Sequence, residues 1–578
     1  MTSDSVPETA EASLAMRIGL VAGPLLGLAV FLLLPAGDAG LSHAAKACAG
    51  VATLMAVWWM TEALPLEATA LLPLVLFPLT GVYSAALAPG DTVQVKPLKA
   101  AARVVSVGES EAVVAFPTPS EPVERTYPLG QLSKPNPFKQ ASAAFADPAI
   151  FLFLGGFLIA LAIEKWGLHR RIALLTVLAV GTQPARLIGG FMLATALVSM
   201  WISNTATTVM MLPIGMSVVA LLTAQLTKPR PVAGDAETGD DAYREADASR
   251  SPESPDGANF ATCLLLGIAY AASLGGFATL IGTPPNVFFR SYLASRDVPI
   301  DFFQWMLFAL PLSLVYLAVA WWLMTKVFFP VRLAEIPGGR ELILGEYQRL
   351  GPMSRGEWVV LIVFLSTSTL WIAGGYLRNW DWLTTRLPLV RALDDPLAAM
   401  LGAIALFVIP VDPRRFIFAL DWKTALKLPW GVLLLFGGGM SLAAAITDSG
   451  LAVWIGSQVT VLARLPALWQ IVLVVALIVF TGELTSNLAA VIAVLPILFQ
   501  VAVGMQIDPL LLCVPAVVAA SCGFMLPVAT PPNAIAFATG RIPLRQMVRA
   551  GFWLDVAAIV LIPAAVYAWG AWVLGIRL

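Results

Sequence analysis

The sequence has little charge for its length. Charged residues make up 12% of the 578 positions, whereas hydrophobic residues make up 58%. Because soluble domains carry about 25% charged residues, this composition excludes an ordinary soluble protein. The formal net charge is −1 and no basic patch is present, so we expect no nucleic-acid partner.

Residues that build metal centres, disulfide frameworks and active sites are also scarce. The two histidines stand near the ends of apolar segments. The four cysteines lie far apart and lack paired spacing: Cys48, Cys263, Cys513 and Cys522. No HExxH motif, GxSxG motif or nucleotide-binding loop lies in an apolar segment. We therefore expect that the chain is not an enzyme, with a membrane-embedded enzyme as a distant alternative.

Long apolar runs, by contrast, fill most of the chain. A helix of roughly 20 apolar residues crosses a bilayer, and about eleven such spans are predicted: 17–36, 44–62, 65–83, 148–165, 261–294, 303–328, 357–377, 397–410, 430–447, 508–539 and 551–575. Two more apolar segments, 185–222 and 467–504, have a polar cluster near the middle and are predicted to be re-entrant hairpins. The predicted fold is an all-α polytopic membrane protein in a lipid bilayer.

The basic residues of the short loops predict the orientation, because Lys and Arg favour the cytoplasmic side. With both hairpins re-entrant, pairs such as Arg170 with Arg171 and Arg414 with Arg415 fall on one side together with the N terminus. We expect the bacterial inner membrane, with the N terminus in the cytoplasm and the C terminus outside. The acidic, polar start lacks the basic stretch of a signal peptide.

Two polar inserts interrupt the spans. Residues 227–259 are rich in Pro, Gly, Ala, Ser and acidic residues, which is typical of a disordered loop, here on the cytoplasmic side. Residues 88–137 contain short alternating stretches bounded by Gly and Pro. This pattern predicts a small β-rich insert on the outer side.

The chain also contains an internal repeat. Residues 151–168 match 434–451 at nine of eighteen positions, with an offset of 283, and the same offset relates Ser203–Asn204 to Ser486–Asn487. The TPPN sequence occurs twice, at 283–286 and 530–533, with an offset of 247. Each copy contains five spans and one hairpin, so the second copy enters the membrane upside down. Inverted repeats with broken helices are typical of secondary transporters, whose sites lie at the repeat interface.

The polar clusters suit an anion and a hard cation. A turn at each hairpin tip presents the free N–H groups of the following half-helix, which attract anions. Asn, Ser and Thr add oxygens that suit Na⁺. Consecutive prolines break a helix, so we expect breaks at Thr283–Asn286 and Thr530–Asn533, with the carbonyl oxygens of Gly282 and Ala529 free to bind a cation. One such cluster alone would be explained as well by helix packing.

The paired tips, Ser203–Thr205 and Ser486–Leu488, and the paired TPPN sequences resemble those of the divalent anion:sodium symporter family. The resemblance implies a homodimer with scaffold and transport domains that work as an elevator. It implies that the substrate-binding residues are Ser203, Asn204, Thr205, Thr283, Pro284, Ser486, Asn487, Thr530 and Pro531. For Na⁺ it implies one site of Ser199, Ser203, Asn204 and Gly282, and a second of Thr485, Asn487 and Ala529.

The predicted boundaries combine the spans, the repeat and the resemblance. They are 1–16 for the cytoplasmic tail, 17–87 for scaffold helices, 88–137 for the β-rich insert, 138–226 for a helix and the first hairpin, 227–259 for the disordered loop, 260–329 for a broken helix and the end of the first repeat, 330–356 for a cytoplasmic linker, and 357–578 for the second repeat.

The sequence departs from the family pattern at the second tip. Leu488 stands where a third polar residue is common, and Gly482 is the equivalent of Ser199, so the second Na⁺ site lacks one side-chain ligand. Glu483 has two interpretations, as a group of the cation site or proton coupling, or as a structural residue bonded to nearby backbone.

The predicted function is sodium-coupled symport of a small divalent anion, with a C4-dicarboxylate such as succinate first. Sulfate or citrate transport, and a proton-coupled carrier or an exchanger of the same fold, are the alternatives. Neither tip contains Lys or Arg, so co-bound cations and helix dipoles must offset the charge of the anion. Each ligand then improves the binding of the other.

Overall fold

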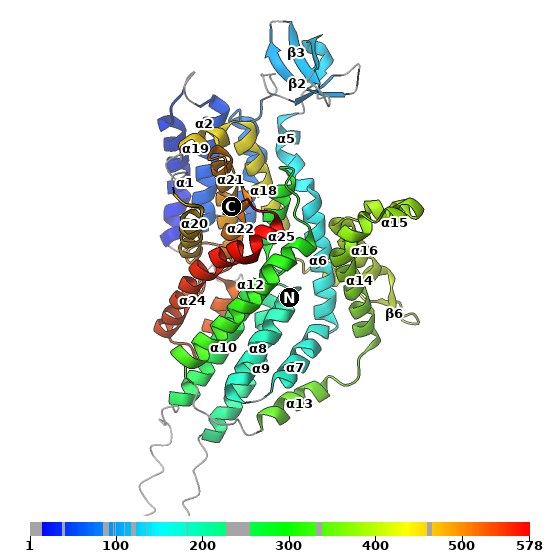
Figure 1. Cartoon of the computed structure of the whole chain (residues 1–578), viewed down its shortest axis with the longest axis vertical. Helices are drawn as coiled ribbons and strands as arrows, with labels where there is room; N and C mark the ends of the chain where they lie inside the picture. The colour runs from blue at the N-terminus through cyan, green and yellow to red at the C-terminus, as the bar shows by residue number, and fades with distance from the viewer. Residues whose placement is uncertain are drawn as a thin grey trace, which may run out of the picture. The chain divides into compact units, whose positions relative to one another are not determined.

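The computed structural model describes residues 14–36, 41–84, 92–95, 98, 100–108, 110–116, 123–133, 136–181, 183–226, 255–330, 338–458 and 465–577 (Figure 1). Within these ranges ten helices are long and apolar enough to cross a membrane. Eight of them coincide with predicted spans, and the other two are the second halves of the predicted hairpins. The predicted spans at 65–83, 397–410 and 508–539 contain shorter apolar helices. The prediction of a helical polytopic membrane protein is therefore confirmed.

The chain divides into two compact units. The first comprises residues 1–150 and 430–460. Its helices are α1 (Leu14–Leu33), α2 (His43–Thr61), α3 (Leu66–Ala70), α4 (Leu72–Leu79), α5 (Pro137–Ala143), α18 (Trp430–Asp448) and α19 (Leu451–Gln458). α1 and α2 meet at Gly27 and Gly50, where a Cβ on either glycine would lie within 2.8 Å of the other's carbonyl oxygen. This close backbone approach fixes the α1–α2 pair.

The segment predicted to be β-rich forms a five-stranded antiparallel sheet in the order β4-β3-β2-β1-β5. The strands are β1 (Thr92–Val95), β2 (Ala100–Val107), β3 (Glu111–Phe116), β4 (Val123–Pro128) and β5 (Leu132–Ser133). Alternate residues of these strands build a small apolar core, which includes Val95, Val104 and Val114. The alternating pattern of the sequence thus gives the sheet a buried face of its own.

The second unit comprises residues 151–429 and 461–578, and α6 (Pro148–Lys165) leads into it. Its first helices are α7 (Leu168–Val180), α8 (Pro184–Ser199), α9 (Asn204–Leu226), α10 (Pro255–Gly276), α11 (Pro284–Ala294) and α12 (Phe302–Trp322). α8, α9 and α10 pack side by side in the cyan to green part of Figure 1. Of the loop predicted at 227–259, residues 227–254 lie outside the described residues, and 255–259 already belong to α10. Residues 1–13 of the predicted tail also lie outside them.

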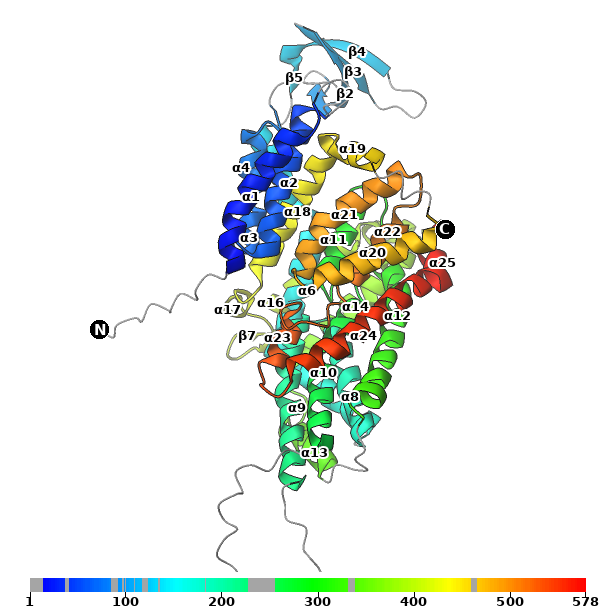
Figure 2. The same cartoon turned by 90° about the vertical axis from the view of Figure 1, so that its left-hand side faces the viewer.

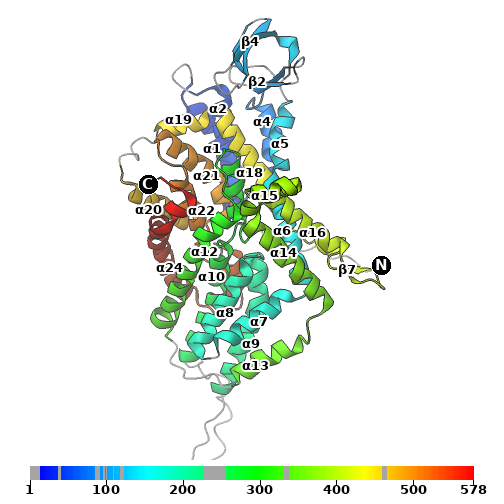
Figure 3. The same cartoon turned by 45° about the vertical axis from the view of Figure 1, so that its right-hand side comes forward.

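A pair of helices, α14 (Arg355–Arg378) and α16 (Asp395–Val408), follows in this unit, and Figure 3 shows the two side by side. Next come α20 (Ala467–Gly482), α21 (Asn487–Gly504), α22 (Leu510–Ala519), α23 (Pro531–Phe537) and α24 (Leu544–Ala565). Figure 2 shows α20, α21 and α22 packed together. The sequence did not predict α7 or α13 (Gly339–Arg349) in the linker, nor the short helices α15 (Asp381–Arg386), α17 (Trp422–Ala425) and α19.

The same order of elements occurs twice in the second unit. α8, a turn and α9 are followed by α10, a break, α11 and α12, and α20, a turn and α21 by α22, a break, α23 and α24. The expected position of the two breaks was wrong: the chain leaves helical geometry at 277–283 and 520–530, and the TPPN prolines begin the next helix. Proline is well accepted in the first helical turn, where its missing N–H would have no partner.

Candidate functional site

The predicted site residues all lie in the second unit, at four interruptions of its helices. Two interruptions are hairpin turns. α8 ends at Ser199, Ser203 lies in the turn, and Asn204 and Thr205 begin α9; Thr485 and Ser486 lie in the second turn, and Asn487 begins α21. The other two are the breaks. Gly282, Thr283, Ala529 and Thr530 end the breaks, and Pro284 and Pro531 begin α11 and α23. The predicted residues therefore lie at or just before the N-termini of α9, α11, α21 and α23, except Ser199, which ends α8.

Oxygen atoms gather beside the first hairpin turn. The Ser199 Oγ lies 2.7 Å from the carbonyl oxygen of Ala272 and 2.8 Å from the Oδ1 of Asn204. A hydroxyl carries a single hydrogen, so Ser199 donates to only one of these two acceptors at a time. Ser199 is fully buried and Asn204 half-buried. Two oxygen acceptors therefore compete for one hydroxyl hydrogen, and a bound cation would satisfy the acceptor that is left without it.

Two glycines allow the backbone to enclose this cluster. A Cβ on Gly276, the last residue of α10, would overlap the amide of Asn204. A Cβ on Gly282 would overlap the carbonyl oxygen of Gly276 and lie 2.9 Å from that of Met200. Gly282, which was predicted from the sequence, and Gly276, which was not, are thus both required by close packing. The Gly275–Gly276 pair at the end of an apolar run was the signal available in the sequence.

The first break is held by side chains of its own segment. Asn286 donates from Nδ2 to the carbonyl oxygens of Phe277, at 3.1 Å, and Thr279, at 2.7 Å. The Thr279 hydroxyl donates to the carbonyl oxygen of Met200 at 2.5 Å and accepts from the Gly282 N–H at 3.1 Å. These bonds fix the non-helical backbone between α10 and α11.

In the second break, Asn533 has the same role as Asn286 in the first. Asn533 donates from Nδ2 to the carbonyl oxygens of Gly523, at 3.0 Å, and Leu526, at 3.1 Å. The Oδ1 atoms of Asn286 and Asn533, and that of Asn487 at the second tip, are buried without a hydrogen-bond partner among the described residues. Buried acceptors of this kind are costly unless they bind something. The break asparagines therefore belong among the candidate functional residues, although only the TPPN threonines and first prolines were predicted.

The second tip has fewer side-chain ligands than the first. The Thr485 hydroxyl donates to the carbonyl oxygen of Thr481 at 3.1 Å, and Ala529 is buried. A Cβ on Gly482 would have no atom within 4 Å. The position equivalent to Ser199 thus opens into free space, as the glycine in the sequence suggested.

Helix packing joins the two copies within this unit. α11, which follows the first break, packs against α21, the helix that begins at the second tip. α23, which follows the second break, packs against α9, the helix that begins at the first tip. Each break of one copy thus leads into a helix that contacts the tip-bearing helix of the other. Within the first copy, Ser199 bonds Asn204, and Gly282 packs against the backbone of Gly276 and Met200.

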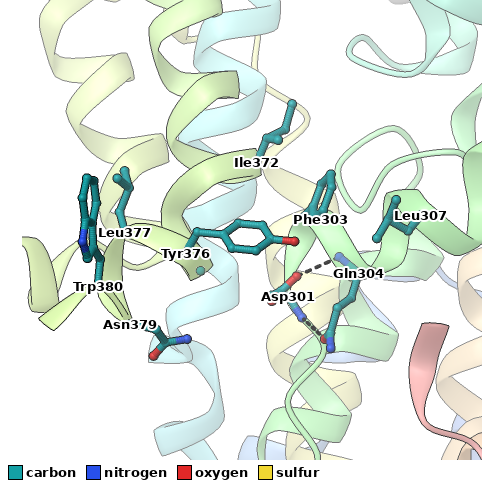
Figure 4. A pocket seen from close by; sticks show the side chains of 10 residues that line it. Asp301, Phe303, Gln304, Leu307, Ile372, Tyr376, Leu377, Asn379 and Trp380 are labelled. Atoms are coloured by element: carbon teal, nitrogen blue, oxygen red, sulfur yellow. Dashed lines mark hydrogen bonds between the residues drawn. The ribbon is translucent and has the colours of Figure 1, made fainter. Parts of the chain in front are cut away.

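A separate pocket of about 700 Å³ lies between the start of α12 and the end of α14 (Figure 4). Tyr376 points from α14 toward α12, and its ring meets that of Phe303 edge to face, with the centroids 5.9 Å apart. Asp301 caps α12 through the N–H of Gln304. None of the predicted site residues lines this pocket, so it is not the candidate site.

Comparisons with known proteins cover nearly the whole chain. Residues 17–576 match the family described as the sodium:sulfate symporter transmembrane region. A sodium-dependent dicarboxylate transporter SdcS from Staphylococcus saprophyticus is 35% identical over 97% of this chain and 92% of its own length. The transporter of the same name from Staphylococcus aureus (strain USA300) is 34% identical over 98% and 93%. The solved YdaH transporter of Alcanivorax borkumensis aligns over 92% of this chain and 100% of its own, with 12% identity and a TM-score of 0.49.

Proposed function

Because the chain belongs to the sodium:sulfate symporter family, we propose that it imports a small divalent anion by symport with Na⁺. Membership in this family confirms a membrane transporter rather than an enzyme. A C4-dicarboxylate such as succinate is the proposed substrate, because the relatives at 34% and 35% identity are sodium-dependent dicarboxylate transporters. Sulfate is the second candidate, since the family description names it.

The observation that carries the proposal is the oxygen cluster at the first tip. The Ser199 hydroxyl oxygen lies within hydrogen-bonding distance of both the Asn204 Oδ1 and the Ala272 carbonyl oxygen, and these two acceptors compete for its single hydrogen. A hard monovalent cation satisfies several oxygens at once, and oxygen ligands do not suit a transition metal. The first proposed Na⁺ site comprises Ser199, Ser203, Asn204 and the carbonyl oxygen of Gly282.

A second proposed Na⁺ site comprises Thr485, Asn487 and the carbonyl oxygen of Ala529. The unpartnered Oδ1 of Asn487 and the free space beside Gly482 support a site with one ligand fewer. Because a site with fewer ligands binds its ion more weakly, we propose that the two Na⁺ ions bind with unequal affinity.

The proposed anion site lies between the two tips and the two breaks. α9 and α21 begin at Asn204 and Asn487, so their N-termini supply free N–H groups and partial positive charge. The proposed anion ligands are Ser203, Asn204, Thr205, Thr283, Pro284, Ser486, Asn487, Thr530 and Pro531. No Lys or Arg lies at either tip, so bound Na⁺ must offset the charge of the anion. This requirement couples the two ligands, because each raises the affinity for the other.

The larger architecture is proposed on the same basis. The repeated order of elements in the second unit supports inverted repeats, and inverted repeats suit alternating access. We propose an elevator mechanism in a homodimer of the bacterial inner membrane, with the N terminus in the cytoplasm and the C terminus outside.

The test is uptake of radiolabelled succinate and sulfate into proteoliposomes that contain the full chain. An inward Na⁺ gradient should drive succinate uptake, whereas choline in place of Na⁺ should abolish it. Uptake that ignores Na⁺ and follows a pH gradient would overturn sodium coupling and favour proton coupling. Sulfate uptake that exceeds succinate uptake would replace the substrate and leave the coupling intact.

A further inference from the structure

The Glu483 side chain accepts hydrogen bonds from the backbone of the second break. Glu483 caps the C-terminal end of α20, directly before the second tip, and its carboxylate is buried. Oε1 accepts from the Met525 N–H and Oε2 from the Leu526 N–H, both at 2.8 Å. Both oxygens of one carboxylate therefore hold two successive N–H groups of the segment between α22 and α23.

The first copy links the equivalent positions by the opposite arrangement. By the offsets of the repeat, Glu483 corresponds to Met200 (483 − 283 = 200) and Leu526 to Thr279 (526 − 247 = 279). In the first copy, the side chain of Thr279 donates to the backbone carbonyl of Met200. In the second, the backbone N–H of Leu526 donates to the side chain of Glu483. Both copies thus tie the hairpin end to the break, with the side chain supplied from opposite positions.

Gly523 lies between the Glu483 carboxylate and Ala529, the proposed cation ligand. A Cβ on Gly523 would lie 3.2 Å from the Cβ of Ala529, 3.6 Å from the carbonyl oxygen of Gly482 and 3.7 Å from the Oε1 of Glu483. Ala529, Gly482 and Glu483 therefore surround one glycine. A displacement of the backbone at Met525 and Leu526 would move the carbonyl oxygen of Ala529 relative to the second tip.

We propose that Glu483 is a positioning residue for the second Na⁺ site. The inference rests on the proposed function, since it requires that Ala529 binds Na⁺. Because Gly482 supplies no side-chain ligand, this site depends on the placement of a backbone carbonyl more than the first site does. Glu483 does not touch the ion; it holds the 523–530 segment so that the Ala529 carbonyl oxygen faces Thr485 and Asn487.

The experiment compares the Na⁺ dependence of succinate uptake in proteoliposomes for the wild type and Glu483→Gln. An amide nitrogen cannot accept a hydrogen bond, so the variant loses one of the two backbone bonds. The Na⁺ concentration for half-maximal uptake should rise about 10-fold, as is typical when a group that orients a metal ligand is lost. The KM for succinate at saturating Na⁺ should stay near the wild-type value. A purely structural role would reduce the amount of folded protein and leave the Na⁺ dependence unchanged.

Two further variants sharpen the result. Glu346→Gln, on α13, removes a carboxylate that pairs with Arg170 of α7, and it should leave the Na⁺ dependence unchanged. Gly523→Ala places a methyl group against Ala529 and leaves both Glu483 bonds intact, so it should also raise the half-maximal Na⁺ concentration. If Glu483→Gln does not fold, Glu483→Asp decides the question, because its shorter side chain keeps the carboxylate but cannot reach both the Met525 and Leu526 N–H groups. An unchanged Na⁺ dependence in Glu483→Asp would overturn the proposal.

The outcomes also separate this proposal from the proposed function. If uptake by the wild type does not depend on Na⁺, the proposed function fails. If the wild type depends on Na⁺ and Glu483→Gln shows the same half-maximal concentration, the positioning role fails and the symport stands. A shift that higher Na⁺ restores to full uptake supports both.

Discussion

The Arg290 guanidinium donates to a carboxylate oxygen of Asp395 at 2.8 Å, which ties the half-helix after the first break to the first turn of α16. The carbonyl oxygen of the same aspartate accepts from the indole N–H of Trp371, on α14, at 3.0 Å. Trp201, two residues before Ser203, stacks on Trp371 with the ring centroids 6.5 Å apart and the planes 7° apart. Both ends of the first candidate site are therefore anchored to the α14–α16 pair.

Asp395→Ala should destabilise the protein strongly. The Asp395 side chain is 3% exposed and that of Arg290 17%, so the variant leaves a largely buried guanidinium without its counter-charge. Breaking a buried pair in this way costs about 3–5 kcal/mol. Thermal unfolding of the purified protein in detergent measures the loss. The double variant Arg290→Leu/Asp395→Leu should recover most of the stability, and equal stability of Asp395→Ala and the wild type would contradict a buried pair.

Asn204→Ala and Asn487→Ala should each abolish sodium-driven succinate uptake in folded protein. The Asn204 Oδ1 lies within hydrogen-bonding distance of the Ser199 hydroxyl. The buried Oδ1 of Asn487 has no hydrogen-bond partner among the described residues. In Asn204→Ala the Ser199 hydroxyl still donates to the Ala272 carbonyl oxygen, and in Asn487→Ala no hydrogen bond of the Oδ1 is lost. We therefore expect both variants to fold. Size-exclusion chromatography checks folding, and uptake into proteoliposomes checks function. Wild-type uptake by both variants would refute the site assignment.

The sequence placed the candidate residues at interruptions of the membrane helices, because their chemistry stands out against the apolar background. A pair of SN dipeptides and a pair of TPPN sequences in a repeated register identify the turns and the breaks, since proline and polar residues are costly inside a membrane helix. The helical fold and the sheet were also predictable from apolar runs and from alternation. The exact position of the breaks was harder to predict, because a proline can follow the end of one helix and can also stand in the first turn of the next.

The contacts of Glu483 and Gly276 could not be predicted from the sequence, for a different reason. Glu483 bonds the backbone 42 and 43 residues further along the chain, and Gly276 is required by the approach of Asn204 from another helix. Both depend on how separate helices pack, which hydropathy does not encode. α7 and α13 were missed because helices of 13 and 11 residues are too short for a search for membrane spans.

Gly276→Ala should lower the affinity for Na⁺ at the first site. The added methyl group overlaps the amide of Asn204, so the Oδ1 must move away from Ser199. Titration of Na⁺ in the uptake assay should show a higher half-maximal concentration. Gly345→Ala on α13, where nothing lies within 4 Å of an added Cβ, is the matched control and should behave as the wild type. An unchanged Na⁺ dependence in Gly276→Ala would show that this glycine only packs the helix.

Gly482→Ser should strengthen the second site, in contrast to the variants above. Serine at 482 restores the side chain that Ser199 supplies in the first copy, and the free space beside Gly482 accommodates it without displacing a neighbour. The backbone at the end of α20 is helical, so serine costs no strain there, and replacement of a helical glycine is mildly favourable. An additional oxygen ligand should lower the Na⁺ concentration for half-maximal uptake.

Gly482→Ala separates the effect of the hydroxyl from that of filling the space. Alanine favours the helix at least as much as serine does but supplies no oxygen, so its Na⁺ dependence should match that of the wild type. If alanine and serine lower the half-maximal concentration equally, helix stability and not ligation explains the gain. If serine leaves it unchanged, the end of α20 does not face a bound cation, and the second site must be built from other residues than Thr485, Asn487 and Ala529.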